Sequence, residues 1–174
     1  MMKGLLRLAS DIEGVAVTEF ALIIGVVSMA LLSTVDIVRY YRARSEVENA
    51  TQMAVQLAWK KCDVTKLPAT ANCPEFLTSI NAGLQSTSLG TNVTLKQNFP
   101  SEGYYCLDTA GVLKSVSDTS SRPADCSSVG NGSAQPVDYV QIQTSYTYHP
   151  LFSGVSIGSL LPSTITSTSM MRME

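Results

Sequence analysis

The chain has 174 residues, enough for one compact domain and an appendage. Its formal net charge of −2 gives no reason to expect binding to nucleic acid or to an anionic surface. Hydrophobic residues make up 45 % and gather in the N-terminal third, whereas the remainder is rich in Ser, Thr, Asn and Gln. Because the chain has one histidine, His149, and lacks a Gly-rich phosphate loop, an HExxH motif and a GxSxG motif, we expect neither an enzyme nor a bound metal or cofactor.

The first 14 residues, MMKGLLRLASDIEG, form a short polar leader that carries Lys3 and Arg7 and ends at Gly14. A basic N-terminal region is typical of targeting signals. An ordinary secretory signal fits poorly, because the apolar run that follows is longer than a signal core and is not followed by a small-x-small cleavage site. We therefore expect residues 1–14 to be a leader of another kind.

The apolar run Val15–Val35 contains 21 residues, and Glu19 is its only charged side chain. As a helix this run spans about 31 Å, close to the ~30 Å hydrocarbon core of a bilayer. We expect residues 15–38 to cross a membrane. A carboxylate at the centre of a spanning helix costs about 2.5–3.5 kcal/mol, and somewhat less near its end. Glu19 is therefore either an incidental acid near the membrane edge or a residue with a role.

Gly14 and Glu19 have the spacing of a processing signal. Gly14 is the last leader residue, Glu19 is the fifth residue after the Gly14–Val15 bond, and Phe20 is the sixth. This arrangement resembles the prepilin cleavage signal, in which a membrane-embedded aspartyl peptidase cuts after the Gly on the cytoplasmic side. Gly has no Cβ, so its backbone fits extended into a tight protease cleft. The resemblance implies that Glu19 neutralises the N-terminal ammonium of an adjacent subunit, which Val15 supplies after cleavage.

The segments GVAVTEFALII and DIVRYYRARSEVENATQMAVQLA resemble one branch of this class, the TadE/TadF-like pseudopilins of the tight-adherence (Flp pilus) system. The segments VQIQTSYTYHPLF and STSMMRME resemble the C-terminal end of the same family. Gly25 stands where many relatives carry a Pro, so we expect a straighter helix here. The matching positions are Glu19, Phe20, Ala21 and Leu22 in the apolar run and Asp36 and Arg39 at the helix exit.

Two signals disagree about topology. By the positive-inside rule, Lys3 and Arg7 before the helix are outnumbered by Arg39, Arg42 and Arg44 after it, which places the C-terminal part in the cytoplasm. All four cysteines lie after the apolar run, which favours an oxidising compartment, and the processing site must face the cytoplasm. We therefore expect a single-pass protein of the bacterial inner membrane, with its head in the periplasm or carried into an extracellular pilus.

An apolar stripe of helical period continues beyond the membrane segment. Neither Pro nor Gly interrupts residues 26–67, so we expect one helix over 15–60. Its continuation, 39–60, belongs to a pilin-like head of residues 39–174, and Trp59 is expected to pack at the helix end. The stripe comprises Tyr40, Ala43, Val47, Ala50, Ala54, Leu57 and Ala58.

Cys62, Cys73, Cys106 and Cys126 are spaced without a CxxC pair, so neither a zinc ribbon nor a thioredoxin-type site is indicated. Four cysteines allow three disulfide pairings. We prefer Cys62 with Cys73 and Cys106 with Cys126, because each bond closes a short local loop. The alternative is that all four are buried free thiols.

The remaining sequence predicts a short second helix and an antiparallel sheet, so the fold class is α+β. Pro68 and polar turn formers end the long helix, and Pro74 opens the second helix, 74–86. Asp108–Gly111 is expected to be a hairpin turn. A sheet face covered by the long helix is what the pilin resemblance implies. Strands are expected in TNVTLKQNF (91–99), GYYCLD (103–108), GVLKSVS (111–117), VDYVQIQTSYTYH (137–149) and STITSTSMMRM (163–173).

The segment PLFSGVSIGSLLP, residues 150–162, is apolar and lies between the two clearest strands. Two interpretations stay open: a buried connection, or an exposed docking surface for a partner or the membrane.

The resemblance implies a minor pilin or pseudopilin of the Flp (Tad) pilus, cleaved by prepilin peptidase after Gly14 and needed for pilus assembly or initiation and for adherence. The implied partners are the peptidase, the major Flp pilin, a paired minor pilin and the inner-membrane assembly platform. Two alternatives remain: a pseudopilin of another, type II-like secretion system, and an uncleaved signal-anchored periplasmic binding domain.

Overall fold

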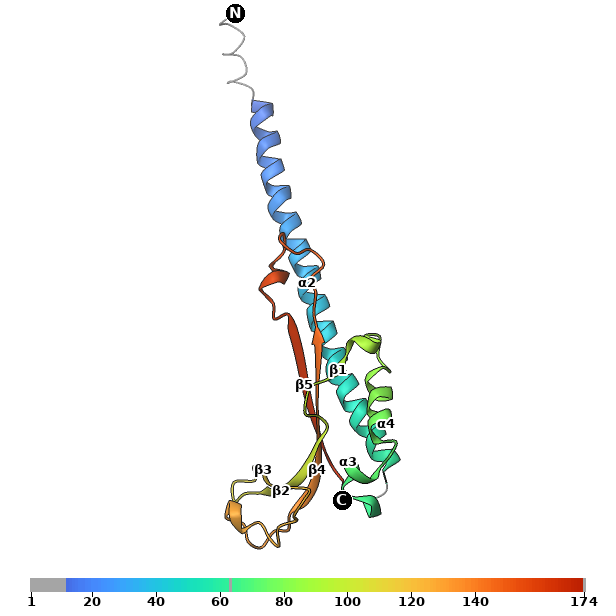
Figure 1. Cartoon of the computed structure of the whole chain (residues 1–174). Coiled ribbons are helices and arrows are strands. Elements are labelled where there is room, and N and C mark those ends of the chain that lie inside the picture. The colour runs from blue at the N-terminus through green and yellow to red at the C-terminus, as the bar shows by residue number, and fades with distance from the viewer. Residues whose placement is uncertain (1–11, 63, 174) are drawn as a thin grey trace, which may run out of the picture. The chain divides into compact units, whose positions relative to one another are not determined.

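The computed structural model describes residues 12–62 and 64–173, so most of the expected leader lies outside the described residues. A 50-residue helix, α2 (Ile12–Lys61), precedes short helices and a five-stranded antiparallel sheet, which confirms the α+β class (Figure 1). The chain divides into two compact units. The helix–loop unit contains residues 12–41 and His149–Pro162, and the sheet unit contains Arg42–Tyr148 and residues 163–173.

Helix α2 is uninterrupted because no residue after Gly25 breaks it before Lys61. The hydroxyls of two threonines in the apolar half donate hydrogen bonds to backbone carbonyls of the helix itself. Thr18 Oγ1 donates to the carbonyl of Val15 at 2.8 Å, and Thr34 Oγ1 donates to the carbonyl of Ala30 at 2.9 Å. These bonds let polar side chains sit in an apolar surface without unpaired donors.

In the sheet unit, the C-terminal half of α2 buries the predicted stripe against its neighbours. Its small residues allow close approach: a Cβ added to Gly83 of α4 (Phe76–Leu84) would lie 2.4 Å from Ala54 Cα. Figure 1 shows α4 alongside this half of α2. Two predicted members, Tyr40 and Leu57, are only half-buried, and Thr51 and Val55 are buried although they were not predicted. The predicted stripe residues that are buried are Ala43, Val47, Ala50, Ala54 and Ala58.

The sheet is organised around β4 (Val137–Thr147), which pairs with β5 (Thr164–Arg172) from Tyr139–Arg172 to Thr147–Thr164. Strand β4 also pairs with β2 and with β1, and β3 extends the sheet beyond β2. Every pairing is antiparallel. The remaining strands are β1 (Thr94–Leu95), β2 (Ser101–Leu107) and β3 (Leu113–Asp118).

Along strand β4, buried and less buried side chains alternate as the sequence predicts, with Val140 and Ile142 buried on one face. Thr144 on the same face is also buried, and its Oγ1 lies 2.7 Å from Thr51 Oγ1 of α2. This hydrogen bond satisfies two buried hydroxyls at once and ties the helix to the sheet.

The β2–β3 hairpin is closed by Asp108, as predicted. The Asp108 carboxylate accepts hydrogen bonds from the backbone N–H groups of Ala110 and Val112, each at 2.9 Å, and lies 2.8 Å from Lys114 Nζ. The bond from Lys114 and the N–H bonds hold the pKa of Asp108 below its usual value.

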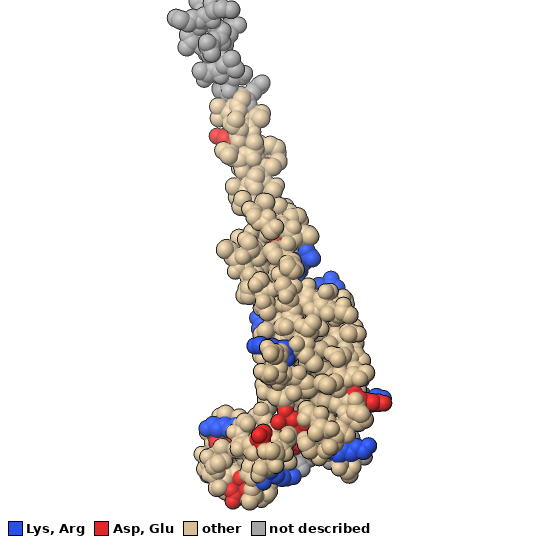
Figure 2. Space-filling view, viewed as in Figure 1, with Lys and Arg blue, Asp and Glu red and all other residues tan. Residues whose placement is uncertain are grey.

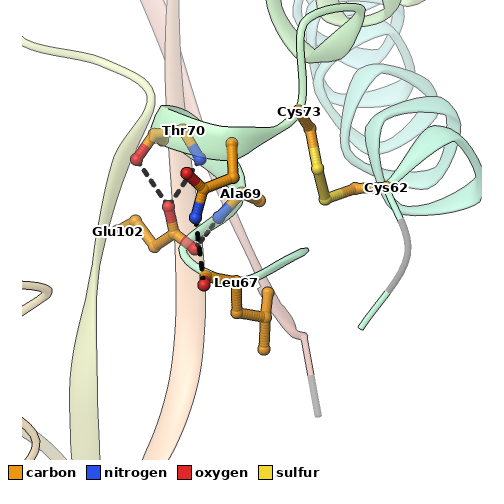
Figure 3. The surroundings of a disulfide bond; sticks show 7 residues. Cys62, Leu67, Ala69, Thr70, Cys73 and Glu102 are labelled. Carbon is orange, nitrogen blue, oxygen red and sulfur yellow. Dashed lines mark hydrogen bonds between the residues drawn. A yellow bond between two sulfur atoms is a disulfide. The ribbon is translucent and has the colours of Figure 1, made fainter. Parts of the chain in front are cut away.

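Two disulfides brace the sheet unit, in the pairing that the sequence favours. Cys62–Cys73 joins the end of α2 to the segment after α3 (Ala69–Asn72), and Cys106–Cys126 joins β2 to the loop before η3 (Ser127–Val129). Figure 3 shows Glu102 of β2 beside α3. Its carboxylate accepts from the N–H groups of Ala69 and Thr70 at 2.5 and 2.7 Å, which caps this short helix.

Three local predictions need correction. The second helix is shorter, Phe76–Leu84, and α3 and two 3-10 turns, η1 (Val64–Lys66) and η2 (Gly90–Asn92), were not expected. The strand predicted over 91–99 shrinks to Thr94–Leu95, because Asn98 adopts a left-handed φ of 67° and Pro100 lacks an N–H for a ladder. Trp59 is 47 % exposed, because the buried face of α2 runs through Val55 and Ala58.

Candidate assembly site

The N-terminal part of α2 presents an apolar surface with no cover. Every residue from 14 to 31 is exposed, and Leu22 and Val26 are 72 % and 71 % exposed. Figure 2 shows this stretch nearly bare of charged side chains on the face in view. Among the described residues, one helix, Gly14–Lys61, is long and apolar enough to cross a membrane. An exposed surface of this composition suggests membrane anchoring.

Glu19 is the only charged residue between Val15 and Val35, and its side chain is exposed. Its carboxylate makes no hydrogen bond or ion pair with any residue that the structure describes. Val15 lies four residues earlier, so the two side chains share one face of the helix. An acid on such a surface is costly in lipid unless another molecule supplies a positive partner.

The Gly14–Val15 bond lies within α2, which the structure describes from Ile12 onward. A Cβ built on Gly14 would meet no atom within 4 Å, and Val15 is 57 % exposed. Packing among the residues that the structure describes therefore gives no reason for a glycine at position 14.

Asp36 forms a second polar site, at the end of the apolar run. Its side chain is fully buried within the helix–loop unit. Oδ1 accepts from the Leu151 N–H at 2.9 Å, and Oδ2 accepts from the Phe152 N–H at 3.3 Å and from the Ser156 hydroxyl. One turn earlier, Ser33 Oγ accepts from the Ile157 N–H at 3.3 Å. These bonds fasten the loop 149–162 to the helix.

Two glycines allow this attachment. A Cβ on Gly158 would lie 2.6 Å from Asp36 Oδ2, so any larger residue displaces the carboxylate. Gly154 has a φ of +87°, which L-residues with side chains rarely adopt. Ser156 caps the 3-10 turn η4 (Ile157–Leu160) through a 3.1 Å bond from the Gly158 N–H to its hydroxyl. Gly158 and Ser156 are therefore explained by the docking of this segment on Asp36, and Gly154 by its backbone conformation.

The loop 149–162 buries its polar anchors and exposes its apolar side chains. Ser156 and Gly158 are buried, whereas Leu151, Val155 and Leu160 are 58 %, 53 % and 82 % exposed. Full burial of one such side chain is worth about 1.5–3 kcal/mol, and this chain alone does not provide it. Of the two interpretations left open by the sequence, the exposed docking surface fits this arrangement.

The sequence motifs identified some of these residues and missed others. Gly14, Val15, Glu19 and Phe20 are all exposed on α2. The docking role of Asp36 was missed, since its partners lie 115–120 residues away along the chain. The available signal was an acid directly after an apolar run, which needs buried donors or water.

An apolar helix with one acid near its start continues into an α+β fold with two disulfides, which defines a candidate single-pass membrane protein. Residues 14–56 match the family model described as TadE-like protein, and the match begins at Gly14 and includes Glu19 and Asp36. The chain is thus TadE-like over the candidate membrane helix and its continuation, as its motifs indicate. No curated protein and no solved structure matches the chain.

A TadE-like segment fits a component of the Tad pilus, and the family consists of structural components of that pilus rather than enzymes. Among the described residues, no group of three or more His, Cys, Asp or Glu side chains is placed to hold a metal ion.

Proposed function

We propose that this chain is a minor pilin or pseudopilin of the Tad (Flp) pilus, cleaved by prepilin peptidase after Gly14 and needed for pilus assembly or initiation and for adherence. The single observation that carries the proposal is the exposed carboxylate of Glu19 on a bare apolar helix. It lies in a TadE-like segment and has no partner among the described residues.

The proposed mechanism is pairing between subunits. Cleavage leaves an ammonium group on Val15, and a neighbouring subunit presents Glu19 at the matching height. Opposite charges about 4 Å apart attract by about 4 kcal/mol at an effective dielectric of about 20, which offsets the cost of a lone carboxylate in lipid. The exposed apolar side chains of residues 14–31 supply the contact surface of the bundle.

This pairing also sets the axial register of the bundle. Val15 and Glu19 are four residues apart, which corresponds to about 6 Å along a helix axis. Two parallel subunits that pair Glu19 with the Val15 ammonium are therefore offset by about that distance. The major Flp pilin, a paired minor pilin and the assembly platform are the proposed partners.

The proposed location is the bacterial inner membrane, with the sheet unit in the periplasm. The two disulfides, Cys62–Cys73 and Cys106–Cys126, support an oxidising compartment for that unit. They outweigh the arginines that follow the helix, because a topology with the sheet unit in the cytosol leaves both bonds in a reducing medium.

A second candidate function, an uncleaved signal-anchored binding domain, is favoured by one pocket in the sheet unit. Its volume is about 330 Å³, and Phe76, Leu77 and Phe99 line it together with Thr70 and Asn98. Retention of the leader, together with saturable binding of a small apolar ligand by the monomer, favours this function over the pilin function.

The test of the pilin function is complementation of pilus production in a strain that lacks this chain. Gly14→Val is expected to abolish pili, whereas Gly25→Val is expected to restore them. The two glycines are matched controls, since both lie on α2 and a Cβ at either position meets nothing within 4 Å. Equal complementation by the two variants contradicts processing after Gly14.

A further inference from the structure

We infer that the loop 149–162 lies in the headgroup region of the lipid bilayer, where it makes a second membrane contact beside the α2 span. The inference rests on the membrane insertion of α2 that the proposed function includes. Its occupant is the bilayer itself, because the loop belongs to the same compact unit as the apolar part of α2 and continues that apolar surface.

The position of the loop along the helix supports this placement. Asp36 and Ser33 hold the loop immediately at the end of the Val15–Val35 run. A helix of this length spans about 31 Å, so a bilayer that covers the run from Val15 has its hydrocarbon boundary near Val35. The anchored loop is therefore at the level where hydrocarbon meets headgroups.

The composition of the loop fits that level. Residues 150–162 contain no charged side chain, and Leu151, Val155, Ile157 and Leu160 are all at least 46 % exposed. Apolar side chains at an interface insert about 5–10 Å into the headgroup and acyl boundary. A protein partner is not needed to explain why the side chains are uncovered.

The backbone of the loop is prepared for a poorly hydrated environment. Seven of its N–H groups bond to Asp36, to Ser33, to the Ser156 hydroxyl or to carbonyls within the loop, so these seven do not need water. The bonded N–H groups are those of Leu151, Phe152, Val155, Ser156, Ile157, Gly158 and Leu161.

The helix residues just beyond the loop anchor have interfacial chemistry. The rings of Tyr40 and Tyr41 meet edge to face with centroids 5.8 Å apart, and Tyr41 is 61 % exposed. Arg39 is exposed as well. Tyrosines concentrate where membrane meets water, and arginines reach toward lipid phosphates from the same level.

The test is depth-dependent quenching of tryptophan by brominated lipids in the full-length chain. Trp59 is the only tryptophan, so Trp59→Phe gives a silent background. Leu160→Trp in that background is reconstituted into vesicles of phosphatidylethanolamine and phosphatidylglycerol, doped with lipids brominated near the glycerol end or near the chain terminus. We expect bromines near the glycerol end to remove most of the Leu160→Trp emission and terminal bromines to remove little.

Two further probes make the outcome decisive. Val112→Trp is a matched exposed control in the charged turn beside Asp108 and Lys114, and no quenching is expected there. Leu22→Trp reports the span and is expected to be quenched by the terminal bromines. If Leu22→Trp is quenched while Leu160→Trp behaves like Val112→Trp, the loop inference fails and the membrane anchor stands. If Leu22→Trp is not quenched either, both fail.

Shielding of the loop by a second copy of this chain is a separate result that overturns the inference. In that case the Leu160→Trp emission shifts to the blue without quenching by either lipid, and the shift grows with the protein-to-lipid ratio. A quenched signal that does not depend on this ratio supports the bilayer.

Discussion

Asp36 and Ser156 are hydrogen-bonded although 120 residues separate them in the chain. The hydroxyl of Ser156 donates to the carboxylate, which also accepts two backbone N–H groups. A buried acid with three donors is satisfied, and a loop fastened at three points keeps a fixed position on the helix. The carboxylate of Asp36 therefore holds in place the loop that carries the exposed apolar side chains at the end of the candidate membrane helix.

Asp36→Asn is expected to release the loop. An amide keeps one acceptor oxygen but turns an NH₂ group toward backbone donors, so at least one buried donor loses its partner. Hydrogen bonds to charged groups are worth about 1.5–3 kcal/mol each, and about 1.4 kcal/mol corresponds to a tenfold change. Hydrogen exchange of the Leu151 and Phe152 amides should accelerate at least about tenfold.

The control for this prediction is Ser33→Ala, which removes only the 3.3 Å bond from the Ile157 N–H. It should accelerate exchange near Ile157 and leave the Leu151 amide protected. Unchanged protection of Leu151 in Asp36→Asn is the result that speaks against Asp36 as the anchor.

Glu19→Gln should separate processing from assembly. The substitution keeps the shape of the side chain and removes the charge that the proposed pairing with the Val15 ammonium requires. We expect the leader to be cleaved as in the wild type, while copurification of the major pilin with the chain falls more than about tenfold, since about 1.4 kcal/mol suffices for that loss. Thr18→Val is the control, because its hydroxyl bonds only to the helix backbone. Normal copurification of Glu19→Gln rules out the pairing role.

Gly83→Ala should destabilise the sheet unit by about 1–3 kcal/mol, because the added methyl group meets the Ala54 backbone and helix α4 must move. Chemical unfolding in detergent, followed by circular dichroism, measures the change. Gly132→Ala is the matched control, since its Cβ meets Ser127 Cβ at an ordinary 3.7 Å. Equal stability of the two variants contradicts the close packing of α4 on α2.

Each disulfide should contribute about 3 kcal/mol to the free energy of unfolding, according to the chain-entropy relation. The closed loops have sequence separations of 11 for Cys62–Cys73 and 20 for Cys106–Cys126, so the second contributes slightly more. Chemical unfolding of variants in which both cysteines of one disulfide are replaced by Ala, with and without reductant, measures the contribution of each disulfide. If reductant does not change the free energy of unfolding of the wild type, the prediction that the disulfides stabilise the fold is wrong.

The Asp108 turn should contribute a pH-dependent part of the stability. Its pKa is depressed in the folded state, first by the hydrogen bond from Lys114 and then by backbone N–H groups. The contribution is therefore present above the unfolded pKa of about 3.9 and is lost as pH falls through the lower folded pKa. The melting-temperature gap between wild type and Asp108→Asn should be constant near neutral pH and close below about pH 4.

Local pattern predicts much of this structure. The helix expected over 15–60 is observed over Ile12–Lys61, because neither Pro nor Gly interrupts its apolar stripe. Strands β4 and β5 follow from alternation and from β-branched residues. The Asp108–Gly111 turn follows from residues whose side chain and φ suit a turn.

What the sequence did not predict depends on contacts between distant segments. Tertiary packing determines three such features: the hydrogen bond between Ser156 and Asp36, the bond from the Ala69 N–H to Glu102, and the exposure of Trp59. Strand β1 is short because of backbone conformation at Asn98, which strand propensity does not encode. Gly14 and Glu19 show the reverse. Under the proposed function an outside partner recognises them as a short local motif, and such a motif is visible in the sequence alone.

The N-terminal mass of the purified chain tests the central claim most directly. The chain is co-expressed with active or catalytically inactive prepilin peptidase, extracted in detergent and analysed by intact-mass spectrometry. With the active enzyme the account predicts a mature chain that begins at Val15, and with the inactive enzyme a chain that still carries Gly14 and the leader. A chain that keeps its leader in the presence of active peptidase, or begins at any other residue, contradicts the account.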